Sequence, residues 1–162
     1  MFKTILVALD ESEAAKEAFE LAVNVATEDK AGLLLVNVID VAKLVAVSGY
    51  ETPYPADAIE TMRESGEQLL KEMLAVCHAK GLKAGTAVGE GDAVDEILRF
   101  ADENDAGLIC IGTHGRTGLS RLFIGSVAEG VLRRANAPVL IVRPSKRAHT
   151  KGHGETAPAQ TR

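Results

Sequence analysis

The feature that most constrains the fold of this chain is an alternation of short β-rich runs with longer stretches of helical periodicity. The β-rich runs are residues 2–9, 32–39, 82–88, 106–111 and 138–142. Several of them are apolar almost throughout, which is typical of parallel strands covered on both faces. A chain of 162 residues is long enough for one domain with its own core.

Between these runs, apolar residues recur every three or four positions and mark one side of four predicted helices. The first stripe runs through Ala15, Ala18, Phe19, Ala22, Val25 and Ala26. This alternation predicts a Rossmann-like α/β fold, with an open, doubly wound, five-stranded parallel sheet and helices on both faces. Ligands of such sheets bind beyond the carboxyl ends of the strands, where the strand order reverses.

Composition argues against several classes of function. The net charge is −5 and aromatic residues make up 4% of the chain, so basic patches and stacking residues for nucleic acid are lacking. No apolar run approaches the roughly 20 residues of a membrane span, and we expect no signal peptide or membrane insertion. Cys77 and Cys110 lack a metal or redox spacing, which favours buried, reduced thiols in a cytoplasmic protein.

Two segments stand outside the alternation. Residues 40–56 form a long connection that contains two prolines and both tyrosines, and such a loop is either a functional flap or locally disordered. Residues 145–162 lack apolar periodicity and are basic. We therefore predict one folded domain over 1–144, followed by a disordered basic tail over 145–162.

Glycines gather where the fourth run ends. They are Gly112, Gly115, Gly118 and Gly125. Glycine lets backbone N–H groups turn toward an anion without a Cβ in the way. A helix predicted to begin near Ser126 adds unpaired N–H groups, and Arg116 and Arg121 add positive charge. The stretch therefore predicts a phosphate cradle.

Two common phosphate motifs are excluded. The string GxxxxGK[ST] of a P-loop does not occur in the chain. The dinucleotide fingerprint GxGxxG should follow the first strand, but the residues there, "ALDES", contain no glycine. The cradle therefore belongs to neither class.

What remains is Gly-x-x-Gly, nine residues, and then Gly-Ser, over 112–126. Together with "ILVALDES", "VGEGDAVDEIL" and "APVLIV" in order, this spacing resembles the ATP-binding branch of the universal stress protein family over residues 2–143. The resemblance implies a fold of the adenine-nucleotide α-hydrolase type, in which the glycine loop holds the α- and β-phosphates of ATP. Glycine spacing alone does not distinguish ATP from ADP, AMP or a cyclic nucleotide.

The resemblance also implies a set of binding residues. They are Ala8, Asp10, Val38, Gly112, Thr113, His114, Gly115, Arg116, Gly125, Ser126 and Val127. In this scheme Asp10 meets the ribose or a bound Mg²⁺, and Val38 offers its backbone to adenine. The other residues from 112 onward contact or flank the phosphates. Two positions depart from the pattern, since Ala8 and Ala93 stand where many relatives carry proline.

Two of these residues have a plain structural alternative. Ser126 could open a capping box with Glu129 three positions on, which stabilises a helix without any ligand. Asp10 could cap the first helix in the same way, with Glu13 as its partner. The sequence leaves both readings open.

Three functions are compatible with such a site. The first is a nucleotide-dependent regulatory protein that acts in a stress response on an unknown protein partner. The second is a slow ATPase or phosphotransferase, although no general base with a supporting residue is evident. The third is a nucleotide-free dimeric interaction module. The apolar run at 138–142 predicts an edge strand that pairs with its copy in a homodimer, and the family resemblance implies the same dimer.

Overall fold

The computed structural model describes residues 1–41, 56–113 and 124–144. The predicted tail at 145–162 and nearly all of the 40–56 connection lie outside the described residues. The elements alternate as predicted. They are β1 (Thr4–Ala8), α1 (Glu13–Asp29), β2 (Gly32–Asp40), α3 (Ala56–Ala79), β3 (Ala84–Gly91), α4 (Ala93–Glu103), β4 (Leu108–Gly112), α5 (Ser126–Arg134) and β5 (Val139–Val142).

The five strands form one parallel sheet in the order β3-β2-β1-β4-β5. The chain moves outward from β1 through β2 to β3, and then returns to pair β4 with the other side of β1. The order therefore reverses between β1 and β4, and their carboxyl ends mark the place where such folds bind ligands. β3 and β5 are the two edge strands.

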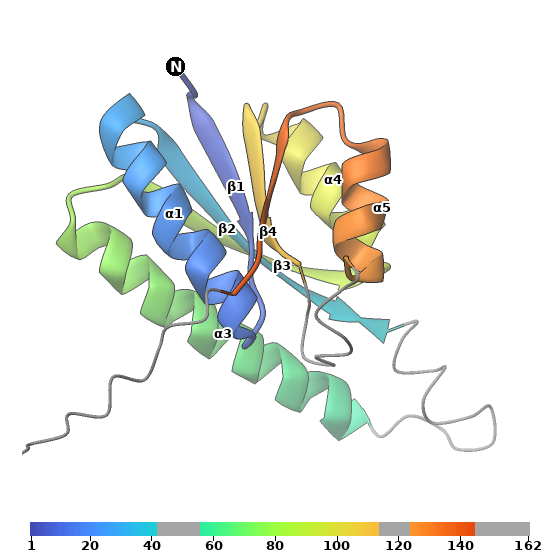
Figure 1. Ribbon diagram of the computed structural model, residues 1–162. Helices are drawn as coiled ribbons and strands as arrows, with labels where there is room; N and C mark the ends of the chain where they lie inside the picture. Colours follow the sequence, from blue (N-terminus) through green and yellow to red (C-terminus); the bar gives the residue numbers. More distant parts are fainter. Residues whose placement is uncertain (42–55, 114–123, 145–162) are drawn as a thin grey trace, which may run out of the picture.

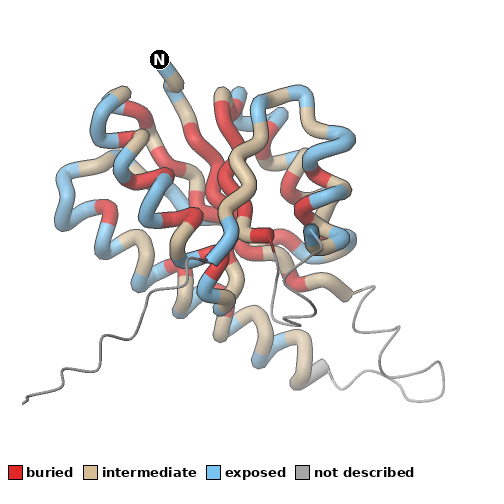
Figure 2. The backbone as a smooth tube through the Cα atoms, in the orientation of Figure 1, coloured by how far each residue is buried: buried red, intermediate tan, exposed pale blue. Residues whose placement is uncertain are grey.

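Helices cover both faces of the sheet, as Figure 1 shows. On one face, α1 and α3 pack on a core cluster that contains Ile5, Val7 and Leu35. On the other face, α4 and α5 pack on a second cluster around Leu6, Ile109 and Val131. The central strands are the most deeply buried part of the molecule (Figure 2). The predicted doubly wound α/β class is confirmed.

Both cysteines lie in the core. Cys77 and Cys110 are free and buried, and burial raises the pKa of the Cys110 thiol to about 12. Burial also raises the pKa of Cys77. Neither thiol carries the low pKa of a reactive cysteine, so the prediction of buried, reduced thiols is confirmed. Among the described residues, no helix is both long and apolar enough to cross a membrane.

Candidate functional site

The candidate site begins at the turn between β1 and α1. One carboxylate oxygen of Asp10 accepts hydrogen bonds from the Ser12 amide at 3.0 Å and the Ser12 hydroxyl at 2.5 Å. Ser12 is also the N-cap of α1, and its Oγ accepts from the Ala15 amide at 3.2 Å. The alternative in which Asp10 caps this helix with Glu13 is therefore wrong. Ser12 caps the helix instead. It also holds the Asp10 side chain at the carboxyl edge of the sheet, which we call the rim.

The carboxyl end of β4 packs directly against the start of α1. A Cβ placed on Gly112 would lie 2.7 Å from the backbone carbon of Ala14 and 2.7 Å from the backbone nitrogen of Ala15. Any side chain at this position would collide with main-chain atoms, which cannot move aside cheaply. Gly112 therefore lets α1 approach the end of β4, which brings that end beside the Asp10 turn. The predicted contact of Gly112 with a phosphate stays a prediction.

Two of the backbone amides in the predicted cradle are bonded within the protein. Thr113, only 1% exposed, donates its N–H to the carbonyl of Val142 at 2.8 Å. Gly125 donates its N–H to the carbonyl of Thr113 at 2.6 Å. This second bond joins the start of α5 to the end of β4. The amides of Thr113 and Gly125 are thus engaged by carbonyls of the chain itself.

Helix α5 begins without a side-chain cap. Its N-cap is Gly125, with φ −63° and ψ 151°, a residue that has no side chain to cap the first turn. The first intrahelical bond runs from the Glu129 amide to the Gly125 carbonyl at 2.9 Å. The amides of Ser126, Val127 and Ala128 therefore have no intrahelical acceptor. They form the positive end of the helix dipole, which suits an anion.

The alternative in which Ser126 opens a capping box with Glu129 is wrong. Ser126 is the first helical residue instead of the cap, so its hydroxyl is one position too far along to accept from the first turn. The Glu129 carboxylate instead pairs with Arg133 at 2.8 Å. The Ser126 side chain is exposed. The residue type was suited to a cap, but the boundary of the helix decided its role.

The predicted adenine side of the site lies on β2. The register of β1 with β2 ends at the pair Ala8–Val36, and β2 continues past it to Asp40. Val38 therefore lies beyond the end of β1. No strand residue of β1 lies opposite its backbone. The run predicted for β2, residues 32–39, stops one residue before the end of that strand. Ala8 and Val127 pack in the core cluster beneath α4 and α5, so their side chains have structural roles.

Other members of the predicted set are not placed. His114, Gly115 and Arg116 lie outside the described residues. Within the described ranges, no group of three or more His, Cys, Asp or Glu residues could hold a metal. Asp10 offers one carboxylate to a Mg²⁺ ion. Mg²⁺ is commonly held by one or two carboxylates together with substrate phosphates, so this residue fits only a metal that arrives with a nucleotide.

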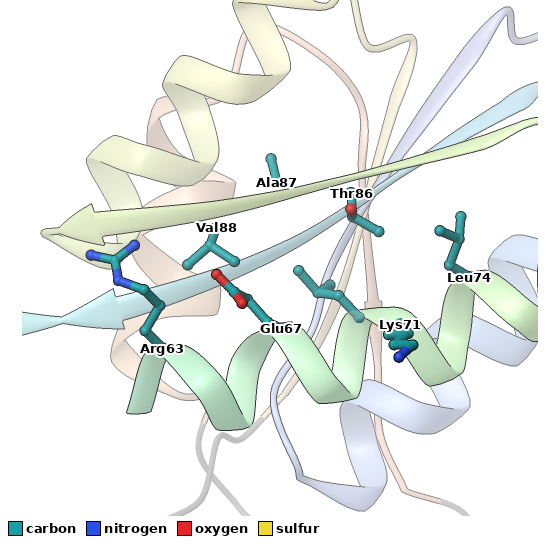
Figure 3. A pocket seen from close by; sticks show the side chains of 8 residues that line it. Arg63, Glu67, Lys71, Leu74, Thr86, Ala87 and Val88 are labelled. Carbon is teal, nitrogen blue, oxygen red and sulfur yellow. The ribbon is translucent and has the colours of Figure 1, made fainter. Parts of the chain in front are cut away.

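A groove of about 550 Å³ lies elsewhere, along the edge of the sheet between α3 and β3 (Figure 3). Arg63, Glu67 and Lys71 line it from α3, while Thr86 and Val88 line it from β3. Arg63 forms an ion pair with Glu90 near the end of β3. The groove is separated from the reversal of strand order by β2, and nothing in the structure identifies an occupant.

Sequence reasoning missed two residues that shape the site. The first is Ser12, although a serine directly before a helical stripe is a recognised cap signal. The second is Asn37, a polar residue inside the apolar run of β2 that is only 7% exposed. A polar residue in a buried strand needs a hydrogen-bond partner, and Asn37 donates from Nδ2 to the carbonyl of Leu9 at 2.8 Å.

The fold and this rim define a doubly wound α/β protein with its candidate site at the reversal of strand order. The model of the Universal stress protein family matches residues 1–143, and the chain belongs to that family.

Individual relatives agree. Universal stress protein MJ0531 from Methanocaldococcus jannaschii is 35% identical over 152 residues, which cover 91% of this chain and 85% of that protein. The solved structure of the protein MJ0577 is similar with a TM-score of 0.77 and 27% identity, covering 90% of this chain and 98% of that one. A universal stress protein solved in complex with cAMP has a TM-score of 0.62 and 25% identity, covering 89% and 98% of the two chains.

Proposed function

We propose that this protein binds an adenine nucleotide, with ATP as the first candidate, and acts as a dimeric regulatory protein of the stress response. The observation that carries the proposal is the uncapped start of α5. Three amides, those of Ser126, Val127 and Ala128, lack an intrahelical acceptor there. They adjoin the end of β4, which packs against the first turn of α1 beside Asp10. The three amides suit an anion, and the Asp10 carboxylate suits a ribose hydroxyl.

A solved relative supports the ligand class, because the universal stress protein in complex with cAMP shares this fold. The proposed role is binding rather than rapid turnover. Fast phosphoryl transfer needs a positioned base and a held metal. His78, the one histidine within the described residues, lies in the last turn of α3. That turn leads into β3 and is at the opposite end of the sheet from the candidate site.

The test removes one of these three amides without disturbing the helix. Proline is well tolerated at the first helical position, and ψ of 151° at Gly125 suits a residue that precedes proline. Ser126→Pro should therefore keep the fold and lower ATP affinity about tenfold, the size of one lost charge-assisted hydrogen bond. Isothermal titration calorimetry with ATP and MgCl₂ measures the change.

Two variants serve as controls for this experiment. Ser126→Ala keeps the amide and removes only the hydroxyl, so it separates the two groups. Ala93→Pro places proline at the same position of α4 and should leave ATP affinity unchanged. Wild-type protein that binds no ATP, ADP, AMP or cAMP, and yields no adenine nucleotide on denaturing extraction, would contradict the proposal. Binding followed by turnover within minutes would favour the slow ATPase instead.

The proposed dimer uses the edge strand β5. The carbonyls of Pro138 and Val142 accept from the Ile109 and Thr113 amides of the β4 segment. Alternate residues of a strand direct their backbone groups to the same side. The N–H and C=O groups of Val139 and Ile141 therefore point away from β4, to the open edge. A two-fold copy of the same strand would pair with them.

Val139→Pro tests this dimer with little damage to the monomer. Proline is accepted at the first residue of an edge strand when its N–H would face outward, and Val139 is that residue. We expect the variant to sediment as a monomer while the wild type sediments as a dimer. Val139 and Ile141 both pack against the core cluster beneath α4 and α5, so the choice of Val139 rests on its place at the start of the strand. A Val139→Pro protein that remains dimeric would exclude this interface.

A further inference from the structure

A buried carboxamide lies beneath the turn that presents Asp10. Asn37 is on the face of β2 that α3 covers, between the buried residues Leu35 and Ile39. A carboxamide in such a place loses its hydration and must be paired by the protein. Its Nδ2 donates to the Leu9 carbonyl. Because a carbonyl accepts only from a donor, this bond also fixes which way the amide group of Asn37 points.

This bond extends the pairing of β1 with β2. The Leu9 amide already donates to the Val36 carbonyl at 2.7 Å, one step past the last residue of β1. The Leu9 carbonyl would next need a donor from β2, and the Asn37 side chain supplies it at 2.8 Å. The N–H and the C=O of Leu9 are therefore both hydrogen-bonded to β2. Asp10 is the next residue in the chain, so these bonds fix where it begins.

Helix α3 closes over the Asn37 side chain. Gly66 lies in the middle of this helix, where glycine is unfavourable. A Cβ on Gly66 would be 2.3 Å from the Oδ1 of Asn37 and 3.0 Å from its Cγ. Such a contact is far inside van der Waals distance, so only glycine leaves room for the carboxamide. The helix backbone in turn restricts the carboxamide to its present orientation.

The neighbouring residue of α3 holds the other side of the turn. The Ser65 hydroxyl donates to the Glu11 carboxylate at 2.8 Å. Helix α3 therefore reaches the residues on both sides of Asp10, through Asn37 to Leu9 and through Ser65 to Glu11. Within the turn, Ser12 anchors the Asp10 carboxylate itself. The place of Asp10 at the rim thus depends on α3 as well as on β1.

We propose that Asn37, confined by Gly66, is a positioning residue that sets the Leu9–Ser12 turn and with it the place of Asp10. The effect on ligand binding rests on the proposed function, in which Asp10 meets the nucleotide. The effect on the turn does not rest on it, because the hydrogen bonds involved belong to the protein alone.

The experiment compares Asn37→Ala, Gly66→Ala and the double variant in the full chain. The amide proton shift of Ser12, recorded by NMR without nucleotide, reports the turn because that amide donates to Asp10. Each single variant should move this resonance and weaken ATP binding about three- to tenfold, the range for one hydrogen bond. The double variant should be no worse than Asn37→Ala, because the new Cβ then has no carboxamide to displace.

Ile97→Val is the control for a general loss of stability, since it trims the core on the other face of the sheet. It should leave both the Ser12 resonance and the ATP affinity unchanged. A Ser12 resonance that does not move in Gly66→Ala, or effects of the two substitutions that simply add, would overturn the proposal. If Asn37→Ala does not fold, Gly66→Ala and Ser65→Ala decide by the same readouts.

The two proposals fail in different ways. Wild-type protein that binds no nucleotide would remove the proposed function, while the Ser12 resonance would still decide whether Asn37 positions the turn. Unchanged Ser12 resonances in variants of a protein that binds ATP would remove the positioning role and leave the proposed function intact.

Discussion

Helices α1, α4 and α5 all begin at the carboxyl rim of the sheet, but their first turns are satisfied differently. Ser12 caps α1 with its hydroxyl, and Asp92 caps α4 by accepting from the Val94 and Asp95 amides at 3.0 Å each. Helix α5 starts at Gly125 with no side-chain cap. Two helix starts therefore carry a side-chain cap, and the third has an N-cap residue that offers none.

The comparison shows where stability and function compete in this molecule. A side-chain cap satisfies one or two of the first-turn amides and contributes about 1 kcal/mol to folding. The same cap would occupy the groups that an anion needs. Among the three helices α1, α4 and α5, the N-cap residue gives up this contribution at α5, next to the reversal of strand order. The described helix starts at the carboxyl rim thus differ, since two have a side-chain cap and one does not.

The largest expected effect comes from Gly112, which joins the completed turn of α1 to the strand that leads to α5. Gly112→Ala would place a Cβ against main-chain atoms of Ala14 and Ala15 at 2.7 Å. We expect a loss of about 3 kcal/mol in the free energy of unfolding, the upper range for overpacking. Urea denaturation followed by circular dichroism measures it. Gly85→Ala, where a Cβ meets no atom within 4 Å, is the matched control and should change stability little.

A second prediction gives α5 the cap that it lacks. The backbone of Gly125, with φ −63° and ψ 151°, accepts an ordinary residue. Gly125→Asp should stabilise the ligand-free protein by about 0.5 kcal/mol, through the cap and a less flexible unfolded chain. Its charge should lower ATP affinity at least about tenfold, which corresponds to about 1.4 kcal/mol.

Gly125→Asn separates the two causes in that experiment, because it offers a cap without a charge. It should match the stability of Gly125→Asp and bind ATP more tightly than that variant does. Equal affinities in calorimetry for Gly125→Asp and the wild type would show that the start of α5 does not receive the anion.

The smallest effects concern the two existing caps. Ser12→Ala and Asp92→Ala should each lose about 1 kcal/mol of stability in urea denaturation. Only Ser12→Ala should also weaken ATP binding, because Ser12 holds the Asp10 carboxylate through its hydroxyl. Ser126→Ala should leave stability unchanged, since that hydroxyl is not a cap. A loss of affinity in Asp92→Ala as large as that in Ser12→Ala would mean that the two turns do not differ in function.

Much of the fold was predictable from local patterns. Apolar runs placed every strand of the described domain with shifts of up to three residues at the ends, and helical stripes placed the helices between them, although α3 begins well before its predicted stripe. The start of α5 at Ser126 was also expected, yet the role of Ser126 was not. One residue decides whether a serine is the cap or the first helical position, and sequence patterns locate helix ends less finely than that.

The candidate site was predictable in place but less so in detail. The glycine spacing pointed to the end of β4, where the strand order reverses. It did not reveal that Gly112 accommodates α1, or that the Thr113 amide bonds to Val142. Nor did it reveal Asn37 beneath α3. Each of these contacts joins residues that are far apart in the chain.

The amino-acid sequence by itself determined the alternation of strands and helices, and hence a parallel α/β sheet. These depend on side-chain periodicity within short windows, where neighbours in the chain are neighbours in space. Only the tertiary structure decided which backbone amides at the rim are bonded within the chain, such as those of Thr113 and Gly125, and which glycines admit another segment. An amide is free or bonded according to carbonyls that packing brings to it, and a Cβ is excluded only by atoms from another element.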